Sequence, residues 1–499
     1  MRLSGFYLRF GEGLDEAANR RVHARLKALL ENLHPAVTDL IPGYASLYVE
    51  FDEARAREGE VRAWAEAAPD AAEGEGRRVE VPVVYDGPDL PELAAWAGIP
   101  EEEVTRLHAG RTYRVFAIGF TPGFPFMAEV DERIAKPRRP EPRKRVPAHS
   151  VGIAGRQTGV YPQESPGGWN LIGRTRVRVF DPHRERPFYL EPGDRVRFVP
   201  GEGPVPPPPE PLELLPEEPI HPVLEVLAPG LLDLPLDAGR FLAGRYGLAR
   251  SGPADPYAAE VANRLVGNPP GTPVLEVNYK GPELLVRQDA VFAFAGFGLG
   301  VRLNGEPLPP WTSFFARAGD RLAFPPEGKG VRGYLAVAGG FALKTFFESA
   351  SVDLRGRIGR PLAAGDVLGL GEVRAVRPGR SFSPRLRPGA TARLRLRPGP
   401  QASPEALAAL LAGVFEVEDA DRMGIRLAGP PVPGGEVTSE GVPLGAVQVP
   451  PGGKPILLLA DRGTLGGYAK PAVLDPRDLP RAAQLAPGDR VRFVLDSAS

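Results

Sequence analysis

Short apolar runs, separated by turns rich in glycine and proline, are the commonest pattern along this chain. Six of these runs alternate between apolar and polar residues or are apolar throughout. They predict β-strands, because successive side chains of a strand point to opposite faces. The six runs are 46–51, 113–118, 176–180, 291–295, 334–338 and 456–460.

Apolar residues recur at helical spacing in only a few segments. Asp15 can cap a helix whose apolar residues lie on one face from Val22 to Leu33. A helix at 53–68 would pair with it and complete a small α+β unit. Asp255-Pro256 and Ser403-Pro404 each combine a capping residue with a first-turn proline, so each predicts the start of a helix.

A shared ten-residue ending indicates internal repetition. Leu190–Val199 and Leu485–Val494 are identical at nine of ten positions, and weaker copies occur at 318–324 and 364–370. In each copy Gly-Asp is typical of a turn, and the alternating run after it is typical of a strand. Repeats of this kind predict related β-domains.

A proline-rich segment from Pro200 to Pro222 divides the chain and predicts an exposed, semi-rigid linker. The predicted fold class is mainly β, with antiparallel β-domains and a small α+β domain at the N-terminus. The predicted divisions are 1–80 for the α+β domain, 81–200 for the first β-domain, 201–220 for the linker, and 221–385 and 386–499 for two further β-domains.

Composition excludes several classes of protein. With 61 Lys+Arg and 62 Asp+Glu the net charge is −1, which argues against a general nucleic-acid binder or a membrane-surface binder. Cysteine is absent, which excludes disulfides, thiol nucleophiles and cysteine-ligated metals. No apolar run reaches the ~18 residues of a membrane span, and the first residues lack a signal-peptide core. We therefore expect a cytoplasmic protein.

Familiar catalytic motifs do not occur in the sequence. It contains no Walker A loop, no dinucleotide-binding fingerprint, no His-Glu-x-x-His and no Gly-x-Ser-x-Gly. Two polar, glycine-rich stretches carry the candidate chemistry instead.

The first stretch, 120–126 followed by 146–170, concentrates hydrogen-bonding side chains in one loop-rich region, as binding loops often do. The alternative is an internal network that holds the long loops in place. Its predicted substrate-binding residues are Gln157, Tyr161, Gln163, Glu164, Ser165, Trp169 and Asn170.

The second stretch, 436–470, places acids, cations and glycines after a buried strand. Its carboxylates could act as a base or hold a metal, and its cations could hold a carboxylate or phosphate. The alternative is a buried Asp–Arg pair that orders the loop. The predicted catalytic residues are Asp461, Glu440 and Lys470, and the predicted substrate-binding residues are Gln448, Arg462 and Tyr468.

A third, smaller cluster precedes a predicted helix. Ser251 and Asp255 lie where a helix N-terminus would bind an anion, so both are predicted to contact substrate. Capping of the helix by Asp255 is the alternative.

These phrases resemble two known families. Residues 1–200 resemble the KipI-like family, also labelled allophanate hydrolase subunit 1, through Gly119–Phe126, Ser150–Gly155 and Gln157–Trp169. Residues 221–499 resemble the KipA-like family, labelled allophanate hydrolase subunit 2. The matching phrases of this second part are Ser251–Pro256, Ala262–Asn268, Tyr334–Gly340, Asp421–Gly424 and Gln448–Lys470.

Two departures from the usual family phrases stand out. His149 stands where the KipI-like phrase usually has a glycine. Before Gly239-Arg240, where the KipA-like family usually carries a Thr-Val-Gln-Asp stretch, this chain has Leu232–Ala238. The two families usually form separate subunits, whereas here they look fused.

The resemblance implies cyclophilin-like β-barrels and the activity of the B and C subunits of prokaryotic ATP-dependent 5-oxoprolinase. That enzyme opens the lactam of 5-oxo-L-proline to glutamate. The resemblance therefore also implies ATP with Mg²⁺ as cofactor and a separate A-type (LamB/YcsF-like) subunit as partner. The lactam oxygen would attack the γ-phosphate of ATP.

Two alternatives follow from the same resemblance. The chain could be a regulatory protein that binds a histidine kinase, or a carboxyltransferase that acts on urea-like amides with a biotin carrier. True allophanate hydrolysis is not expected, because the Ser-Ser-Lys arrangement of amidases does not occur in the sequence. A homo-oligomer is possible, and no nucleic-acid or membrane partner is expected.

Overall fold

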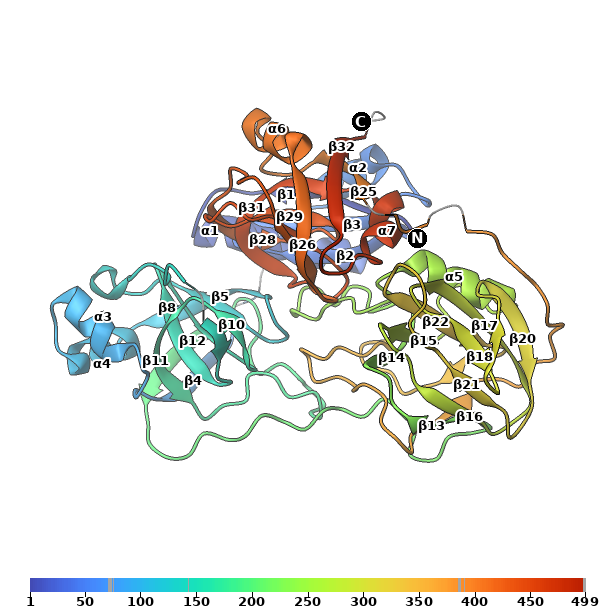
Figure 1. Ribbon diagram of the computed structural model, residues 1–499. Coiled ribbons are helices and arrows are strands. Elements are labelled where there is room, and N and C mark those ends of the chain that lie inside the picture. The colour runs from blue at the N-terminus through green and yellow to red at the C-terminus, as the bar shows by residue number, and fades with distance from the viewer. Residues whose placement is uncertain (71–73, 75, 142, 385–386, 390, 497–499) are drawn as a thin grey trace.

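The computed structural model describes residues 1–496 except 71–73, 75, 142, 385–386 and 390. The predicted division between 385 and 386 lies outside the described residues. The chain is mainly β, and Figure 1 shows its sheets grouped into a barrel, a two-sheet domain and an upper body that contains both ends of the chain.

The N-terminal unit is an antiparallel sheet of order β1-β3-β2 with two helices on it. Asp15 caps the first helix as predicted, because its carboxylate accepts a hydrogen bond from the backbone N–H of Ala17. The second helix begins later than predicted, because a turn separates it from the strand that ends at Asp52. In this turn the backbone carbonyl of Asp52 accepts hydrogen bonds from the N–H groups of Arg55 and Ala56. The elements are β1 (Leu3–Arg9), α1 (Glu16–Glu31), β2 (Val37–Pro42), β3 (Ser46–Asp52) and α2 (Glu58–Ala67).

A closed barrel follows, with strand order β11-β4-β12-β5-β6-β9-β8. Two helices that the sequence analysis did not predict, α3 and α4, pack their apolar sides on the barrel core. The elements are β4 (Arg78–Val84), α3 (Leu90–Ala97), α4 (Glu101–Ala109), β5 (Thr112–Ile118), β6 (Pro125–Ala128), η1 (Glu132–Ile134), β7 (Arg143–Val146), β8 (Ser150–Ala154), β9 (Gln157–Val160), β10 (Ser165–Gly167), β11 (Asn170–Thr175) and β12 (Arg195–Pro200).

The predicted strand at 176–180 is wrong. The strand ends at Thr175, whose hydroxyl accepts from the N–H of Val177 and donates to the carbonyl of Pro82. This local turn competes with continued pairing in the sheet.

The domain after the linker stacks two sheets around one apolar core. One sheet has the order β19-β18-β21-β16-β13-β24-β23, and the other has the order β14-β15-β22-β17-β20. Its elements are β13 (Pro222–Ala228), β14 (Leu232–Leu236), α5 (Pro256–Leu265), β15 (Val274–Asn278), β16 (Glu283–Val286), β17 (Ala290–Phe297), β18 (Val301–Leu303), β19 (Glu306–Leu308), β20 (Thr312–Ala316), β21 (Arg321–Ala323), β22 (Arg332–Val337), β23 (Phe341–Ala342) and β24 (Val367–Leu370).

The C-terminal domain repeats the strand order of the first barrel. Its order is β25-β32-β26-β27-β30-β29-β31, with β31 pairing back to β25 and β28 added beyond β31. Its elements are β25 (Thr391–Pro398), α6 (Pro404–Ala412), β26 (Val414–Ala420), β27 (Gly424–Ala428), β28 (Glu436–Gly441), β29 (Ala446–Val449), β30 (Ile456–Leu458), β31 (Leu465–Leu474), η2 (Pro476–Asp478), α7 (Leu479–Ala482) and β32 (Arg490–Leu495).

The repeated endings have the same role in both barrels. β12 lies parallel to β4 and antiparallel to β5, and β32 lies parallel to β25 and antiparallel to β26. In all four Gly-Asp copies the Asp carboxylate accepts from the backbone N–H three residues earlier. The four aspartates are Asp194, Asp320, Asp366 and Asp489.

The linker is more firmly attached than its proline content predicts. Leu215 is buried in the core of the two-sheet domain, and Leu214 is buried in a cluster that this domain shares with Phe180 and Phe188. The backbone of Leu212 exchanges hydrogen bonds with Arg357 and Gly359. The second half of this segment therefore packs along the domain that follows it.

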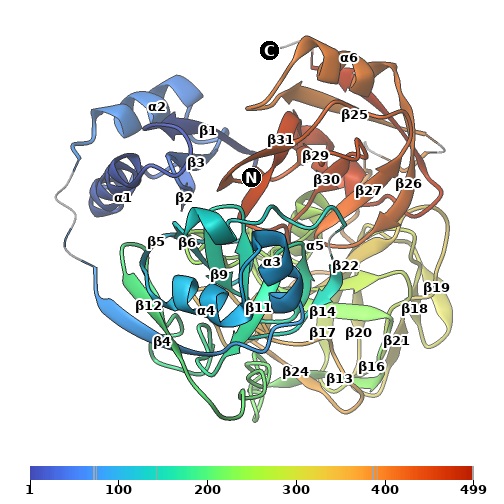
Figure 2. The same ribbon diagram turned by 90° about the vertical axis from the view of Figure 1, so that its left-hand side faces the viewer.

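The first and last parts of the chain lie side by side. In Figures 1 and 2 the N-terminal unit (blue) stands beside the C-terminal domain (red and orange), above the first barrel. The Tyr7 hydroxyl donates to the carbonyl of Gly441 at 2.7 Å across this boundary. Every helix in the described part of the chain is too short or too polar to serve as a membrane span.

Candidate functional site

Loops from three domains meet at what we call the central junction, formed by residues 118–124, 238–252, 351–357 and 460–465. Ile118 of the first barrel forms a bridge with Tyr246 of the two-sheet domain. Arg355 donates to the carbonyl of Phe120 at 3.4 Å and stacks over its ring. A Cβ added to Gly463 would lie 3.0 Å from the same carbonyl, so glycine permits this close approach.

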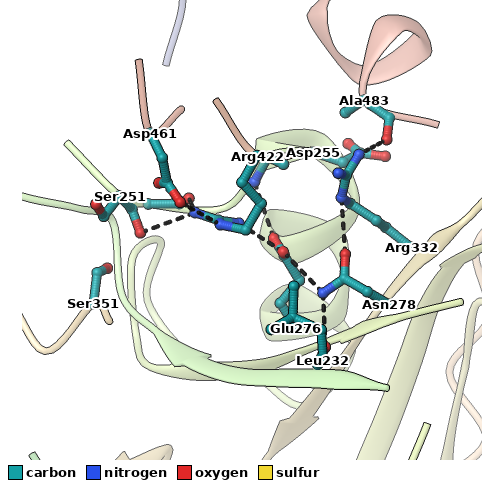
Figure 3. Close-up of polar contacts among 12 residues, drawn as sticks. Leu232, Ser251, Asp255, Glu276, Asn278, Arg332, Ser351, Arg422, Asp461 and Ala483 are labelled. Atoms are coloured by element: carbon teal, nitrogen blue, oxygen red, sulfur yellow. Dashed lines mark hydrogen bonds and ion pairs between the residues drawn. The ribbon is translucent and has the colours of Figure 1, made fainter. Parts of the chain in front are cut away.

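A buried ion-pair network centred on Arg422 forms one wall of the junction (Figure 3). Its Nε lies 2.9 Å from Asp461 Oδ2, and its Nη1 lies 2.6 Å from Glu276 Oε1. Burial alone would lower the pKa of Arg422, but the two carboxylates raise it above its ordinary value. The buried Asp–Arg pair considered from the sequence exists, yet the partner of Asp461 is Arg422 and not Arg462.

The Ser251–Asp255 loop is held by the same network. Arg422 Nη2 donates to the carbonyl of Gly252 at 2.8 Å. Asp255 caps α5 by accepting from the N–H of Ala258, which confirms the capping alternative. Burial raises the pKa of Asp255 to about 6. Ser251 is fully buried with φ of 54°, and its hydroxyl has no hydrogen-bond partner among the described residues.

The two predicted cations of the C-terminal stretch are already paired. Arg462 donates to Glu50 Oε2 at 3.2 Å, and the Lys470 ammonium lies 3.1 Å from Glu440. The side chains of these four residues are at most 6% exposed. Arg462 and Lys470 are therefore not free to bind an anionic substrate, because each is already paired with a glutamate.

The carboxylates do not fit a shared magnesium site. Asp461 is held by Arg422, whereas Glu440 accepts from Arg9 and Gln401 as well as from Lys470. The described residues include no group of three or more Asp, Glu or His side chains placed to hold a metal ion.

The first polar stretch surrounds an aromatic cluster. Tyr161 and Trp169 pack with Phe124 and Phe126, and Leu465 of the C-terminal domain inserts into the same cluster. Burial raises the pKa of Tyr161 above its ordinary value, and Tyr468 lies on β31 opposite Glu436 of β28. The structure thus brings the two predicted stretches together.

The remaining predicted side chains of the two stretches differ in whether they already have hydrogen-bond or ion-pair partners. Gln157 accepts from the Tyr44 hydroxyl at 2.7 Å, and Asn170 donates to the carbonyl of Ile153 at 3.1 Å. Glu164 forms an exposed pair with Arg145. Three further predicted residues lie in buried positions: Gln163 and Ser165 each have an atom without a partner among the described residues, and Gln448 lies against Gly466.

Two clefts lie between domains: the first adjoins the N-terminal unit, the two-sheet domain and the C-terminal domain, and the second lies between the N-terminal unit and the C-terminal domain. One, of about 350 Å³, is walled by Met1, Ala238, Gly252, the first turn of α5 and Leu444. The other, of about 470 Å³, runs along β1 and faces Pro398–Pro400. Neither Gln163 nor Asp461 is among the residues that line these two clefts.

Three functional candidates were missed by sequence reasoning: Arg240, Asp353 and Arg422. Arg422 lies inside Asp421–Gly424, a phrase that carried the family resemblance, whereas Arg240 follows the stretch that departs from the usual family phrase. Asp353 lies in an Asp-Leu-Arg-Gly turn that has no local catalytic signature. Their significance comes from contacts between distant segments, which local patterns do not reveal.

Comparison with known proteins matches the chain to one family in two parts. Residues 2–190 match the carboxyltransferase domain, subdomains C and D, and residues 246–495 match its subdomains A and B. The chain belongs to the carboxyltransferase-domain family. The two parts of the family domain thus occur here in one polypeptide.

Relatives within the family carry two kinds of name. The first part is 45% identical over 192 residues to the B subunit of 5-oxoprolinase from Escherichia coli O157:H7, covering 37% of this chain and 86% of that protein. The second is 33% identical over 268 residues to the C subunit of 5-oxoprolinase from Haemophilus influenzae, covering 52% of this chain and 86% of that protein. Urea amidolyase of Lachancea kluyveri is 29% identical over 305 residues, and this chain spans 17% of its length.

A solved structure covers nearly the whole chain. The crystal structure of TTHA0988 is 57% identical, with a TM-score of 0.95 over 99% of this chain and 100% of that one. Its architecture therefore matches the fused arrangement described above.

Proposed function

We propose that this chain unites the roles of the B and C subunits of 5-oxoprolinase, and that with an A-type subunit and ATP it opens the lactam of 5-oxo-L-proline. The B-like and C-like relatives, each matched over most of its length, support the proposal. The carboxyltransferase-domain family supplies the scaffold, and the substrate is inferred from the names of those relatives.

One observation carries the proposal furthest: the B-like and C-like parts share buried ion pairs. Glu50 in the B-like part accepts from Arg462 in the C-like part and also pairs with Arg250. Buried pairs of this kind are costly to separate, because separation exposes unpaired charges in a dry interface. The two parts therefore form one unit, as expected if both must contribute to one active centre.

The reaction sets the chemical requirements of the site. The coupled reaction consumes two water molecules: one opens the ring by breaking the bond between C5 and the lactam nitrogen, which gives glutamate, and the other balances the cleavage of ATP to ADP and phosphate. An amide is a poor electrophile, so positioning and charge neutralisation would supply most of the acceleration. Arg355 places a guanidinium at the central junction, where it donates to the carbonyl of Phe120, whereas the charge of Arg422 is already balanced by Asp461 and Glu276. Mg²⁺ would enter with the nucleotide, since Asp461 and Glu440 are already paired.

Reconstitution tests the proposal. The full chain is mixed with a purified A-type subunit, ATP, Mg²⁺ and 5-oxo-L-proline, and glutamate and phosphate are measured while each component is omitted in turn. We expect equal amounts of both products only in the complete mixture. Glutamate formation that is absent from the complete mixture, with both proteins folded, would contradict the proposal.

A second candidate function is carboxyl transfer from biotin to an amide nitrogen. The family description and the urea amidolyase relatives favour it, although the chain spans only a small part of those relatives. It predicts that carboxylated biotin carrier transfers its carboxyl group to urea or a similar amide when this chain is added. Binding of a histidine kinase stays a prediction of the sequence resemblance, testable by pull-down.

A further inference from the structure

Unpartnered polar atoms gather beside the Arg422 network. Nε and Nη1 of Arg240, the hydroxyl of Ser251 and Oδ2 of Asp353 have no hydrogen-bond partner among the described residues. All three residues are at most 1% exposed. Buried polar groups in folded proteins almost always have partners, so these unused donors and acceptors form a candidate binding site for a small polar ligand.

The backbone brings the three residues together. Residues 238–240 lie against 250–252, and the N–H of Arg240 donates to the carbonyl of Arg250 at 2.8 Å. Arg240 Nη2 donates to the carbonyl of Ser351, two residues before Asp353. Figure 3 shows Ser251, Ser351 and Asp461 at one end of the Arg422 side chain.

The charge of Arg240 is only partly compensated. Burial lowers its pKa, opposed at longer range by Asp353, Asp237 and Asp461. Asp237 accepts from the hydroxyls of Ser349 and Ser351, and Asp461 is paired with Arg422. The Nε–H and both Nη1–H bonds of Arg240 therefore remain unused within the described chain.

We propose that Arg240 binds the carboxylate of a small amide-bearing acid, and that Ser251 and Asp353 complete this subsite. A guanidinium with unused N–H bonds in a dry site is the strongest carboxylate partner that proteins offer. The unused oxygen of Asp353 accepts an amide N–H, and the hydroxyl of Ser251 can donate to the ligand or accept from it.

We assign this ligand as 5-oxo-L-proline, an assignment that rests on the proposed function. Its carboxylate and its lactam N–H are on neighbouring ring atoms, so one ligand can meet the donor of Arg240 and the acceptor of Asp353 together. Ala238, Arg250 and Gly252, on the same two loops, wall the cleft of about 350 Å³. The proposal includes a route for the ligand, which would enter through this cleft and pass along the two loops to Arg240.

Calorimetric titration of the full chain tests the subsite. The probes are 5-oxo-L-proline and 2-pyrrolidinone, which has the same lactam without the carboxylate. We expect at least tenfold tighter binding of the acid, and at least a 30-fold loss of acid binding in Arg240→Met. Arg264→Met, on the exposed face of α5 where it pairs with Glu260, is the matched control and should bind as the parent does.

Ser251→Ala is a second variant that tests the same subsite if Arg240→Met does not fold. Circular dichroism checks both variants, and Ser251→Ala should weaken acid binding by three- to tenfold. Equal binding of the acid and 2-pyrrolidinone, unchanged binding in a folded Arg240→Met, or no binding of the acid at all would overturn the subsite.

The assay also separates the subsite from the proposed function. Lactam opening that survives Arg240→Met with an unchanged KM would refute the subsite alone. Acid binding that depends on Arg240, without any lactam opening in the complete mixture, would refute the proposed function alone.

Discussion

Glu50 and Arg462 lie 412 residues apart in the chain and form a buried ion pair, with 3.2 Å between Oε2 and Nη2. Arg250 pairs with the other oxygen of the same carboxylate. One side chain of the N-terminal unit therefore joins the two-sheet domain and the C-terminal domain. Although burial would raise the pKa of Glu50, the two guanidinium groups hold it below its ordinary value.

Replacing Glu50 by Gln should strongly destabilise the protein. The change leaves Arg250 and Arg462 buried without an opposing charge, which typically costs about 3–5 kcal/mol. Chemical denaturation of the purified variant measures the loss. Glu58→Gln is the matched control, because its pair with Arg62 is 37–49% exposed and should contribute less than about 1 kcal/mol. Similar losses in both variants would contradict this role of Glu50.

Asp39 should make the stability of the protein depend on pH. Burial first, and then the nearby Glu50 carboxylate, raise its pKa from 3.8 to about 6. Between pH 4 and 6 the folded state therefore holds a proton that the unfolded state releases, so the contribution of Asp39 to stability is greatest below pH 4 and falls as the pH rises to 6.

Asp39→Asn tests that dependence. The amide oxygen can still accept from the N–H groups of Leu40 and Gly244. We expect the variant to be about 1–3 kcal/mol more stable than the parent at pH 8 and nearly equal to it at pH 4. Denaturation curves at both values measure the difference, and a gain of the same size at both would rule out titration of Asp39 as its cause.

Lys470 should resist amine-reactive reagents in the folded protein. Its side chain is 0% exposed, whereas that of Lys454, which also pairs with a glutamate, is 67% exposed. Brief acetylation followed by peptide mass spectrometry should modify Lys454 at least tenfold faster, with the two rates converging after denaturation. Rapid modification of Lys470 in the native protein would instead support direct contact with substrate.

Local patterns were enough to predict the repeated turns and the helix caps. Asp15, Asp255 and Ser403 cap helices as predicted, because capping depends only on residues within one turn. The helices α3 and α4 were missed, since each is short and shows few apolar repeats. Their stability comes from packing on the barrel, which a local window does not contain.

The pairing of charges could not be predicted from the sequence. Asp461 is next to Arg462 in the chain, but the fold directs them to Arg422 and Glu50 respectively. Which cation meets which carboxylate is decided by the packing of domains, and thus by contacts across hundreds of residues. The same reason explains why Arg240 and Asp353 were not among the predicted site residues.

The central claim is that this chain activates a lactam carbonyl with ATP, and oxygen labelling tests it most directly. 5-Oxo-L-proline labelled with ¹⁸O at the lactam carbonyl is converted by the chain, an A-type subunit and ATP, and the released phosphate is analysed by mass spectrometry. The account predicts one ¹⁸O atom in each phosphate. The lactam oxygen attacks the γ-phosphate, one water molecule then adds to C5 as the C–N bond breaks, and a second attacks the carbonyl carbon of the acyl phosphate, so that its C–O bond breaks and the labelled oxygen leaves with phosphate. Unlabelled phosphate, with all of the label retained in glutamate, would contradict it.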